Sequence, residues 1–285
     1  ELGAWASADS ALALLQQKAK RSRLLLPCRS LDALLGSALE CGPGILEVCG
    51  LPGTGKTQLC LQLCAAAQIP AGGARPGAAT GEAIFVDAEG SFVPQRYAQI
   101  CRALLAERWP GAGEAELEAV MRGMHVCRTY DATELFATVK QLGGFLGTRP
   151  RVRALVIDSL AFSFRHEFGD SQPQRARILA DLAATLRRYG SERDLRAVVT
   201  NHMTTRFDRG DLNSDSGWLV PALGETWAHQ PSTQVRLERL GERAAGPEPA
   251  GPLYRATLSK SVEQAVGRSC TFRITEGGLR EAPPQ

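Results

Sequence analysis

One eight-residue stretch constrains the fold of this chain more than any other feature. Residues 50–57 read Gly-Leu-Pro-Gly-Thr-Gly-Lys-Thr, which is the G-x-x-x-x-G-K-[ST] pattern of a phosphate-binding loop. A β-type run at 45–49 precedes the loop, and a helix-type run at 58–65 follows it. A strand, a glycine-rich turn and a helix in this order predict an α/β fold. In such a fold, backbone N–H groups and a helix N-terminus surround a phosphate group.

The loop residues have distinct expected roles. We expect nucleotide contacts from Gly50, Leu51, Pro52, Gly53, Thr54, Gly55, Lys56, Thr57 and Gln58. Lys56 should reach the β- and γ-phosphates and support catalysis, and the Thr57 hydroxyl should bind Mg²⁺. The competing interpretation is a glycine-rich turn before an ordinary helix. Under that interpretation, the motif would lie between a strand and a helix by coincidence.

Composition limits the remaining possibilities. The chain has 285 residues and a net charge of +3, so no strong field favours a polyanion, and nucleic-acid binding would depend on local arginines. The sequence contains no run of eighteen apolar residues, so it predicts no membrane span, and its start shows no secretory signal. The chain begins with Glu1 rather than Met, so terminal signals of a longer protein would not be visible.

The eight cysteines predict reduced thiols in a cytosolic or nuclear protein. None forms a C-x-x-C pair, and most lie inside apolar runs, where thiols behave as small hydrophobic groups. Cys60 and Cys64 are one helical turn apart, which is half of a metal site, but no His or Cys pair completes it.

Hydrophobic patterning predicts a mainly parallel sheet with helices on both faces. Residues 8–21 predict a short amphipathic helix, and residues 30–36 a helix capped by Ser30 and closed by Gly36. Strand-like runs at 83–88, 125–129, 154–159 and 197–201 alternate with helix-like runs at 95–108, 114–122, 133–146 and 173–189.

The pattern changes near residue 230. The later runs at 233–240, 254–261 and 270–275 predict an antiparallel extension, with 241–252 as a long hairpin tip and 70–81 as an earlier loop. We expect one α/β domain over 1–285, in which 1–40 are lead-in helices.

Polar residues follow three of the predicted strands, at the edge where parallel sheets bind ligands. Glu89 is placed to orient or deprotonate an attacking water, and Asp158 ends an apolar strand, as a residue that holds Mg²⁺ or its water does. Asn201 and His202 could sense a γ-phosphate. Alone, Asp158 would also fit a helix cap, and Glu89 a solvated turn carboxylate.

Several segments extend these motifs. Residues 87–92 followed by Arg96, then 156–159 and 200–203, together resemble the ATPase core of the RecA-type recombinases. Residues 49–60, 164–167 and 219–227 resemble more closely one eukaryotic paralogue of these recombinases, a homologous-recombination repair protein. The resemblance runs from about residue 28 to residue 281, and these three segments are more specific together than the phosphate-binding loop alone.

The resemblance implies a RecA-like fold and further roles. It implies that Glu89 is the catalytic glutamate, that Arg96 packs near adenine, and that Asn201 and His202 act as the sensor. It also implies that the loops at about 164–176 and 203–219 face single-stranded DNA. Arginines and aromatic residues suit that contact: Arg165, Arg175, Arg177, Arg206, Phe207, Arg209 and Trp218. Acidic residues in both loops dilute the charge, so a solvated flexible loop remains the alternative.

The chain departs from the family pattern at two positions. His202 stands where the sensor is usually glutamine; it is shorter and titratable, which affects coupling between the nucleotide and the second loop. Lys260 falls where the recombinase presents an acidic cap to its neighbour's nucleotide, and could meet a phosphate directly. An ordinary strand-end lysine is the alternative. The family's small N-terminal helical domain is absent from this sequence.

These patterns predict a slow, DNA-stimulated ATPase that uses ATP and Mg²⁺. The resemblance implies a hetero-oligomer of recombinase paralogues with ATP at subunit interfaces, acting on single-stranded DNA and recombinase filaments. It also implies a location in the nucleus and the cytoplasm, without membrane contact. The main alternative is an interaction scaffold in which ATP is structural. A small-molecule P-loop kinase is a third class, which the strands after residue 230 fit poorly.

Overall fold

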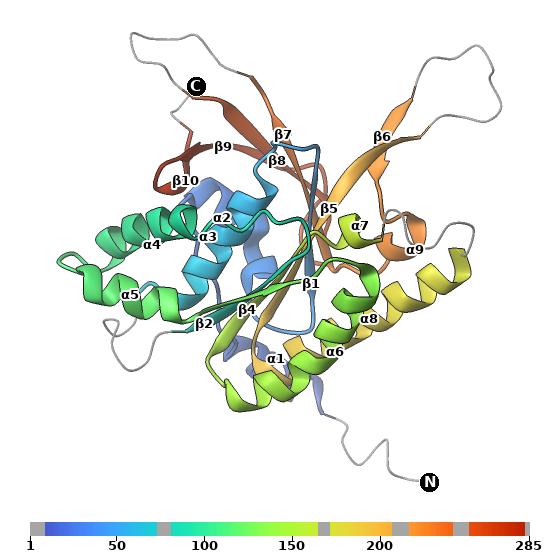
Figure 1. Ribbon diagram of the computed structural model, residues 1–285, viewed down its shortest axis with the longest axis horizontal. Coiled ribbons are helices and arrows are strands. Elements are labelled where there is room, and N and C mark those ends of the chain that lie inside the picture. The colour runs from blue at the N-terminus through green and yellow to red at the C-terminus, as the bar shows by residue number, and fades with distance from the viewer. Residues whose placement is uncertain (1–8, 73–80, 165–171, 207–216, 242–250, 283–285) are drawn as a thin grey trace.

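The structure is a computed structural model that describes residues 9–72, 81–164, 172–206, 217–241 and 251–282. These residues form a ten-stranded sheet with helices on both faces (Figure 1). The strands are β1 (Ile45–Gly50), β2 (Glu82–Asp87), β3 (Met124–Arg128), β4 (Val152–Asp158), β5 (Arg196–Arg206), β6 (Trp218–Pro221), β7 (Thr233–Arg239), β8 (Leu253–Lys260), β9 (Ser269–Thr275) and β10 (Gly278–Glu281).

The helices alternate with the first strands, as the patterning predicted. They are α1 (Ala11–Ala19), α2 (Arg29–Leu35), the 3₁₀ helix η2 (Gly36–Leu39), α3 (Lys56–Gln68), α4 (Pro94–Arg108), α5 (Glu114–Arg122), α6 (Ala132–Thr148), α7 (Leu160–Ser163), α8 (Gln172–Arg193) and α9 (Glu225–Ala228). No helix among these combines the length and the apolar character needed to cross a membrane.

The sheet order is β10-β9-β8-β7-β1-β5-β4-β2-β3, with β6 paired only to β5. Neighbouring strands are parallel among β7, β1, β5, β4, β2 and β3. The strands β8, β9 and β10 pair antiparallel with their neighbours. The predicted fold class, a parallel RecA-like core with an antiparallel extension, is therefore confirmed. Because β1 lies between β5 and β7, the phosphate-binding loop leaves the middle of the sheet, and every residue of β1 is buried.

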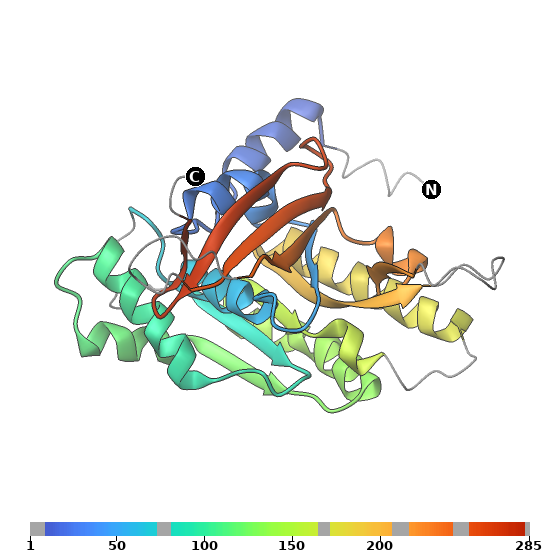
Figure 2. The ribbon, with the colours of Figure 1, turned by 90° about the horizontal axis from the view of Figure 1, so that it is seen from above.

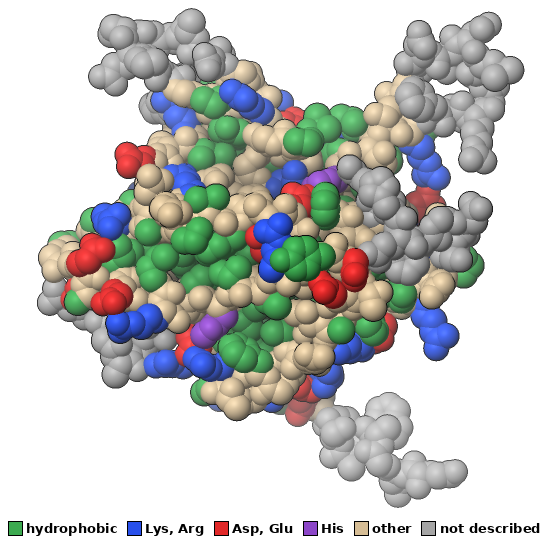
Figure 3. All heavy atoms as spheres, in the orientation of Figure 1, with side chains coloured by type: hydrophobic (Ala, Val, Ile, Leu, Met, Phe, Trp, Pro, Cys, Tyr) green, Lys and Arg blue, Asp and Glu red, His purple; other side chains and the backbone are tan. Residues whose placement is uncertain are grey.

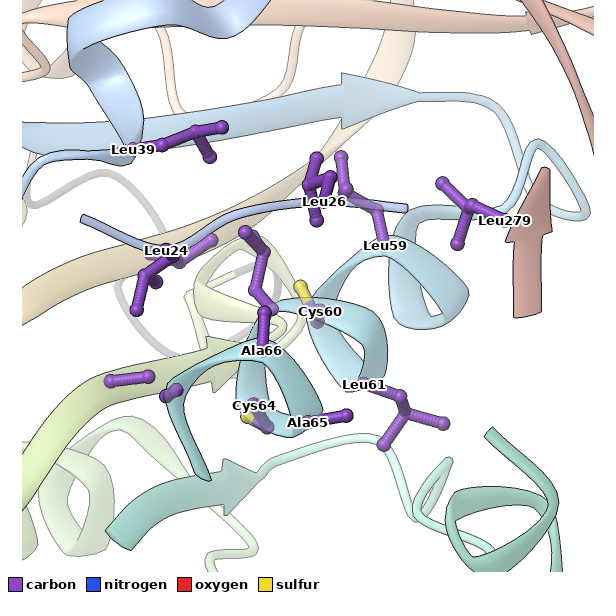
Figure 4. Packing of buried hydrophobic residues seen from close by; sticks show 14 of the residues in the cluster. Leu24, Leu26, Leu39, Leu59, Cys60, Leu61, Cys64, Ala65, Ala66 and Leu279 are labelled. Atoms are coloured by element: carbon purple, nitrogen blue, oxygen red, sulfur yellow. The ribbon is translucent and has the colours of Figure 1, made fainter. Parts of the chain in front are cut away.

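Two apolar cores, one on each face, hold the helices to the sheet. Helices α2 to α5 cover one face, and α6 to α9 cover the other (Figures 1 and 2). Figure 4 shows that α3 inserts Leu59, Cys60 and Cys64 into the first core beside Leu24 and Leu26. All eight cysteines are free thiols, and burial raises the pKa of Cys60 well above its usual value. The six buried thiols therefore pack as apolar groups, whereas Cys127 and Cys270 are partly exposed.

The structure differs from the sequence prediction at several elements. Ser30 does not cap α2: the cap position is Cys28, without a side-chain hydrogen bond, so the helix begins one residue before Ser30. The short helix predicted near the start is present as α1, but no residue of α1 is buried, and Leu12 and Leu15 are exposed. The four-residue elements α7, β6, α9 and β10 were not predicted, since such short segments carry no readable period.

Candidate functional site

The loop between β1 and α3 forms the floor of a cleft of about 590 Å³. Gly53 and Gly55 have φ values of +76° and +92°, a left-handed backbone that glycine adopts without strain. A side chain at Gly55 would collide with Ile274, which also lines the cleft. The cleft is lined by Pro52, Gly53, Gly55, Lys56, Thr57, Gln58, Glu89, Phe162, His202, Met203, Tyr254 and Ile274.

Lys56 lies inside this loop with its charge directed at backbone carbonyls. Its Nζ donates hydrogen bonds of 3.1 Å to the carbonyl oxygens of Gly50 and Leu51. Burial lowers the pKa of Lys56, while the nearby carboxylates of Asp158 and Glu89 oppose this effect. A desolvated ammonium group held only by carbonyl oxygens would gain from a phosphate oxygen, so the loop suits a phosphate ligand.

Asp158 ends β4 beside the start of α3 and accepts three hydroxyl hydrogen bonds. Its Oδ2 accepts from Thr57 at 2.6 Å and from Ser91 at 3.1 Å, and its Oδ1 accepts from Thr200 at 2.5 Å. Burial raises the pKa of Asp158, although the hydrogen bonds from Thr200 and Thr57 act in the opposite direction. The structure thus brings together Thr57 and Asp158, the two residues predicted to hold Mg²⁺.

The donor set at Asp158 fits magnesium rather than a transition metal. One carboxylate and one hydroxyl leave most positions to water and phosphate, as Mg²⁺ prefers. Among the described residues, no group of three or more His, Cys, Asp or Glu side chains gathers as a metal site. Sequence reasoning missed Ser91 and Thr200; a hydroxyl residue near each motif carboxylate was the available signal.

Glu89 projects from a turn that the Asp87 side chain organises. Asp87 accepts hydrogen bonds from the backbone N–H groups of Gly90 at 2.8 Å and Ser91 at 2.9 Å, and pairs with Arg128 at 3.0 Å. Gly90 has a φ of +78°, so the turn reverses directly after Glu89. The motif Asp-Ala-Glu-Gly-Ser therefore fixes where the Glu89 carboxylate points.

The Glu89 carboxylate contacts Ser159, which follows β4, and His202 of β5. Its Oε1 accepts a hydrogen bond of 2.9 Å from Ser159 and a second one from His202. Ser159 Oγ also lies 3.3 Å from His202 Nε2. Burial raises the pKa of Glu89, but the hydrogen bonds from His202 and Ser159 and the charge of Lys56 outweigh it, so the net pKa is lowered. Glu89 is therefore held as a carboxylate in contact with the residue at the sensor position.

Asn201 points away from the cleft into the sheet. Its Nδ2 donates 2.7 Å to Glu47, a fully buried carboxylate of β1 that also accepts from Trp227 at 2.8 Å and from Gln234 at 2.6 Å. Of the predicted sensor pair, only His202 lines the cleft. Glu47 joins four elements that meet near the phosphate-binding loop: β1, β5, α9 and β7.

Arg96 lies on α4 next to one end of the cleft. Its Nε donates 2.7 Å to Gln58, and its Nη2 donates 2.7 Å to the carbonyl oxygen of Thr275. Burial lowers the pKa of Arg96. Arg96 thus connects the helix after the phosphate-binding loop to the turn between β9 and β10, and the predicted adenine contact stays a prediction.

The predicted DNA-contact residues fall into three groups. Arg165, Phe207 and Arg209 lie outside the described residues. Arg177, Arg206 and Trp218 are exposed, and Arg206 pairs with Glu225 at 2.9 Å. Arg175 is half-buried and donates 3.3 Å to the carbonyl oxygen of Ala222, so it contacts its own chain. Figure 3 shows acidic and basic side chains interspersed over this view, without a continuous basic stripe.

Lys260 lies at the opposite edge of the sheet from the loop of its own chain. It pairs in register with Gln234 at the start of β7, and its Nζ donates 2.8 Å to the carbonyl oxygen of Ala228. Burial lowers the pKa of Lys260, and Glu47 opposes this. The cap prediction concerned the nucleotide of a neighbouring subunit, and it stays a prediction.

The strand order and the cleft at its carboxyl edge together define a P-loop ATPase core of the RecA type. The sequence profile of the Rad51 family matches residues 18–281. The chain therefore belongs to the Rad51 family, whose members are ATPases.

Three relatives illustrate the similarity. The chain is 34% identical over 285 residues to "DNA repair protein RAD51 homolog 3" of Cricetulus griseus, covering 96% of this chain and 72% of that protein. It is 32% identical over 281 residues to "DNA repair protein XRCC3" of Bos taurus, covering 96% and 80%. It is 31% identical over 211 residues to "DNA repair protein RAD51 homolog 4" of Bos taurus, covering 73% and 59%. The chain is therefore similar to several Rad51 paralogues at comparable levels.

Proposed function

We propose that this protein is an ATP-binding and ATP-hydrolysing subunit of a recombinase-paralogue complex in homologous-recombination DNA repair. The observation that carries this proposal is the meeting of Lys56, the Thr57–Asp158 pair and the Glu89–His202 pair around one cleft. The names of the relatives, which are DNA repair proteins, support the biological context. The fold and its cleft support the ATPase chemistry.

In this proposal ATP is the substrate and Mg²⁺ the cofactor. Lys56 and the backbone of the loop bind the phosphates. Thr57 and Asp158 would hold Mg²⁺, which would supply positive charge to neutralise the phosphates. Glu89 orients and deprotonates the attacking water. His202, on β5, stabilises the Glu89 carboxylate through the hydrogen bond between the two side chains.

Turnover is expected to be slow and stimulated by DNA. Glu89 is already engaged by Ser159 and His202, so its carboxylate must exchange partners before it can act on water. His202 belongs to β5, which continues to Arg206 and pairs with β6. DNA bound near Arg206 and Trp218 would act on the same strand that carries His202.

We assign the chain to the paralogue C subgroup, the group of RAD51 homolog 3. Overall identity does not separate the subgroups, because the identity to XRCC3 is comparable with that to RAD51 homolog 3. The support for this choice comes from the segments 164–167 and 219–227. Its partners would be other recombinase paralogues, with ATP at subunit interfaces, together with single-stranded DNA and the recombinase filament. The expected location is the nucleus and the cytoplasm.

Two substitutions test the proposal. Lys56→Ala removes the cation that faces the phosphates, so it should abolish both ATP binding and DNA repair in cells. ATP binding is measured with a fluorescent ATP analogue. Lys20→Ala removes an exposed lysine outside the cleft and serves as the control. If Lys56→Ala leaves both nucleotide affinity and repair unchanged, the proposal is wrong.

A second candidate function is an interaction scaffold in which ATP is structural. The engagement of Glu89 by two side chains favours it, since a carboxylate with both partners retained would not activate water. Glu89→Gln separates the two functions, with Glu118→Gln on the exposed side of α5 as the control. Loss of turnover, by about 10²- to 10⁴-fold, together with loss of repair supports the enzyme. Retained repair with ATP still bound supports the scaffold.

A further inference from the structure

A second pocket, of about 350 Å³, lies at the edge of the sheet opposite the nucleotide cleft. Its walls come from residues at the amino ends of three neighbouring strands: Gly44 before β1, Arg196 at the start of β5 and Thr233 at the start of β7. Helices α1 and α8 and the turn after β8 complete it. Ligands of parallel α/β folds bind at the carboxyl edge, so this pocket is no part of the nucleotide site.

Arg196 is the most deeply buried cation of this pocket, with 5% of its surface exposed. Its guanidinium donates 2.7 Å to the carbonyl oxygen of Gly44 and 3.4 Å to that of Ser37, and its Nε has no hydrogen-bond partner in the part of the chain that the structure describes. No carboxylate of the described residues lies within ion-pair distance of Arg196. Burial lowers the pKa of Arg196 to about 10. A desolvated guanidinium without an ion-pair partner is costly, and an anion in the pocket would offset that cost.

The backbone before β1 is shaped to let two guanidinium groups approach. A Cβ atom at Gly42 would lie 2.9 Å from Arg21 Nη1, and one at Gly44 would lie 2.8 Å from Arg196 Nη1 and 2.5 Å from Ser232 Oγ. Glycine at both positions therefore lets the two guanidinium groups and the Ser232 hydroxyl lie directly against the backbone before β1. A methyl group at either position would displace them.

The charge of the pocket is positive. Six of its lining side chains carry charge, four of them cationic: Lys18, Arg21, Arg187, Arg196, Glu40 and Glu263. Glu263, on the turn after β8, pairs with Lys18 at 2.5 Å, and this hydrogen bond together with one from Ser37 lowers the pKa of Glu263. The Glu263 carboxylate thus already binds Lys18 at the rim of the pocket, where an external anion would compete with it.

We infer that this pocket binds a compact tetrahedral phosphate group, either free inorganic phosphate or a small phosphomonoester. Guanidinium forks match phosphate oxygens with paired hydrogen bonds, and the hydroxyls of Ser37, Ser232 and Thr233 supply neutral donors. The bound phosphate competes with Glu263 for Lys18. Because Glu263 lies on the turn that follows Lys260, weakening the Lys18–Glu263 pair loosens that turn. The pocket thereby links anion binding to the position of that turn.

Isothermal calorimetry on the full chain tests this inference. The nucleotide cleft is first saturated with Mg²⁺ and a non-hydrolysable ATP analogue, so that its phosphate positions are filled. Inorganic phosphate and glycerol 3-phosphate are then titrated separately. Tighter binding of the first identifies free phosphate, and tighter binding of the second identifies a phosphomonoester; either result supports the site.

Three variants locate the binding. Arg21→Met should weaken it about tenfold, and the Arg21 side chain forms no hydrogen bond with the described residues, so folding should be unaffected. Gly44→Ala should weaken it similarly by displacing Arg196. Glu263→Gln should tighten it about fivefold, because a competing carboxylate is removed. Arg193→Met, an exposed arginine at the end of α8 and outside the pocket, is the control.

Two results would overturn the inference. The first is the absence of millimolar or tighter binding of either probe to the unsubstituted chain. The second is binding that Arg21→Met and Gly44→Ala leave unchanged while both proteins melt at the normal temperature.

Discussion

Thr200→Val is the sharpest test of how Asp158 is held. Thr200 and valine have nearly the same shape, and Thr200 is fully buried, so the substitution removes one hydroxyl without opening a cavity. The lost hydrogen bond is the 2.5 Å contact from Thr200 Oγ1 to Asp158 Oδ1. A hydrogen bond to a charged group contributes about 1.5–3 kcal/mol, so the free energy of unfolding at pH 7 should fall by about 2 kcal/mol.

The pH dependence of this loss has a definite sign. Burial raises the pKa of Asp158, the hydrogen bond from Thr200 opposes that rise, and the substitution should therefore raise the pKa further. Thr200 stabilises the ionised carboxylate. The stability difference between the two proteins is thus present at pH 7 and should shrink as the pH falls through the pKa of Asp158.

Urea unfolding followed by tryptophan fluorescence measures the stability, and a magnesium titration with a fluorescent ATP analogue measures the site. A residue that orients a metal-binding carboxylate typically contributes about 10- to 100-fold in metal affinity, so the magnesium midpoint should rise by that factor. Thr204→Val, at an exposed position further along β5, is the control. A Thr200→Val protein within about 0.5 kcal/mol of the unsubstituted chain, with the same magnesium midpoint, would refute this reasoning.

Three further substitutions probe other parts of the structure. Gly90→Ala forces a side chain into a left-handed turn and against Arg128; ATPase activity should fall while ATP affinity is retained, and unchanged activity would contradict the role of the turn. Trp227→Phe removes one donor to the buried Glu47 and should lower the free energy of unfolding by about 1.5–3 kcal/mol in urea; no loss would show that this hydrogen bond is dispensable. Burial raises the pKa of Glu82, but its histidine and arginine partners outweigh it and lower the net value. The stabilisation by Glu82 is then present above its ordinary pKa and is lost as the pH falls through its lowered pKa in the folded protein. Glu82→Gln should therefore lower the free energy of unfolding at neutral pH but not in acid. A loss of stability that persists in acid would argue against these pairs.

Much of the fold could be predicted because its signals are local. The strand before the phosphate-binding loop, the helix after it and the alternation up to residue 201 each extend over enough residues to show a period. Strand ends were accurate within about two residues, apart from β5. Four of its last five residues are polar and the last three are exposed, so the apolar run stops at Asn201 while the strand continues to Arg206.

The candidate site was predictable to a different extent. Lys56, Thr57, Asp158 and Glu89 belong to motifs whose spacing places them at one edge of the sheet, and the structure brings them together there. The direction of a side chain has no such signal. Asn201 turns into the sheet because Glu47, more than 150 residues earlier, accepts its hydrogen bond, and a contact of that separation leaves no local pattern.

The length of β5 has a mechanical consequence. Its first six residues are buried inside the sheet, whereas Thr204, Thr205 and Arg206 are exposed and paired with β6. At about 3.4 Å per residue, the exposed end lies roughly 14 Å beyond His202 along the same unbroken strand. The described residues of β5 beyond His202 are therefore held by backbone pairing to β6 and belong to the same strand as His202. A displacement of Arg206 or Trp218 would reach the Glu89 carboxylate through this continuous backbone and the His202 side chain.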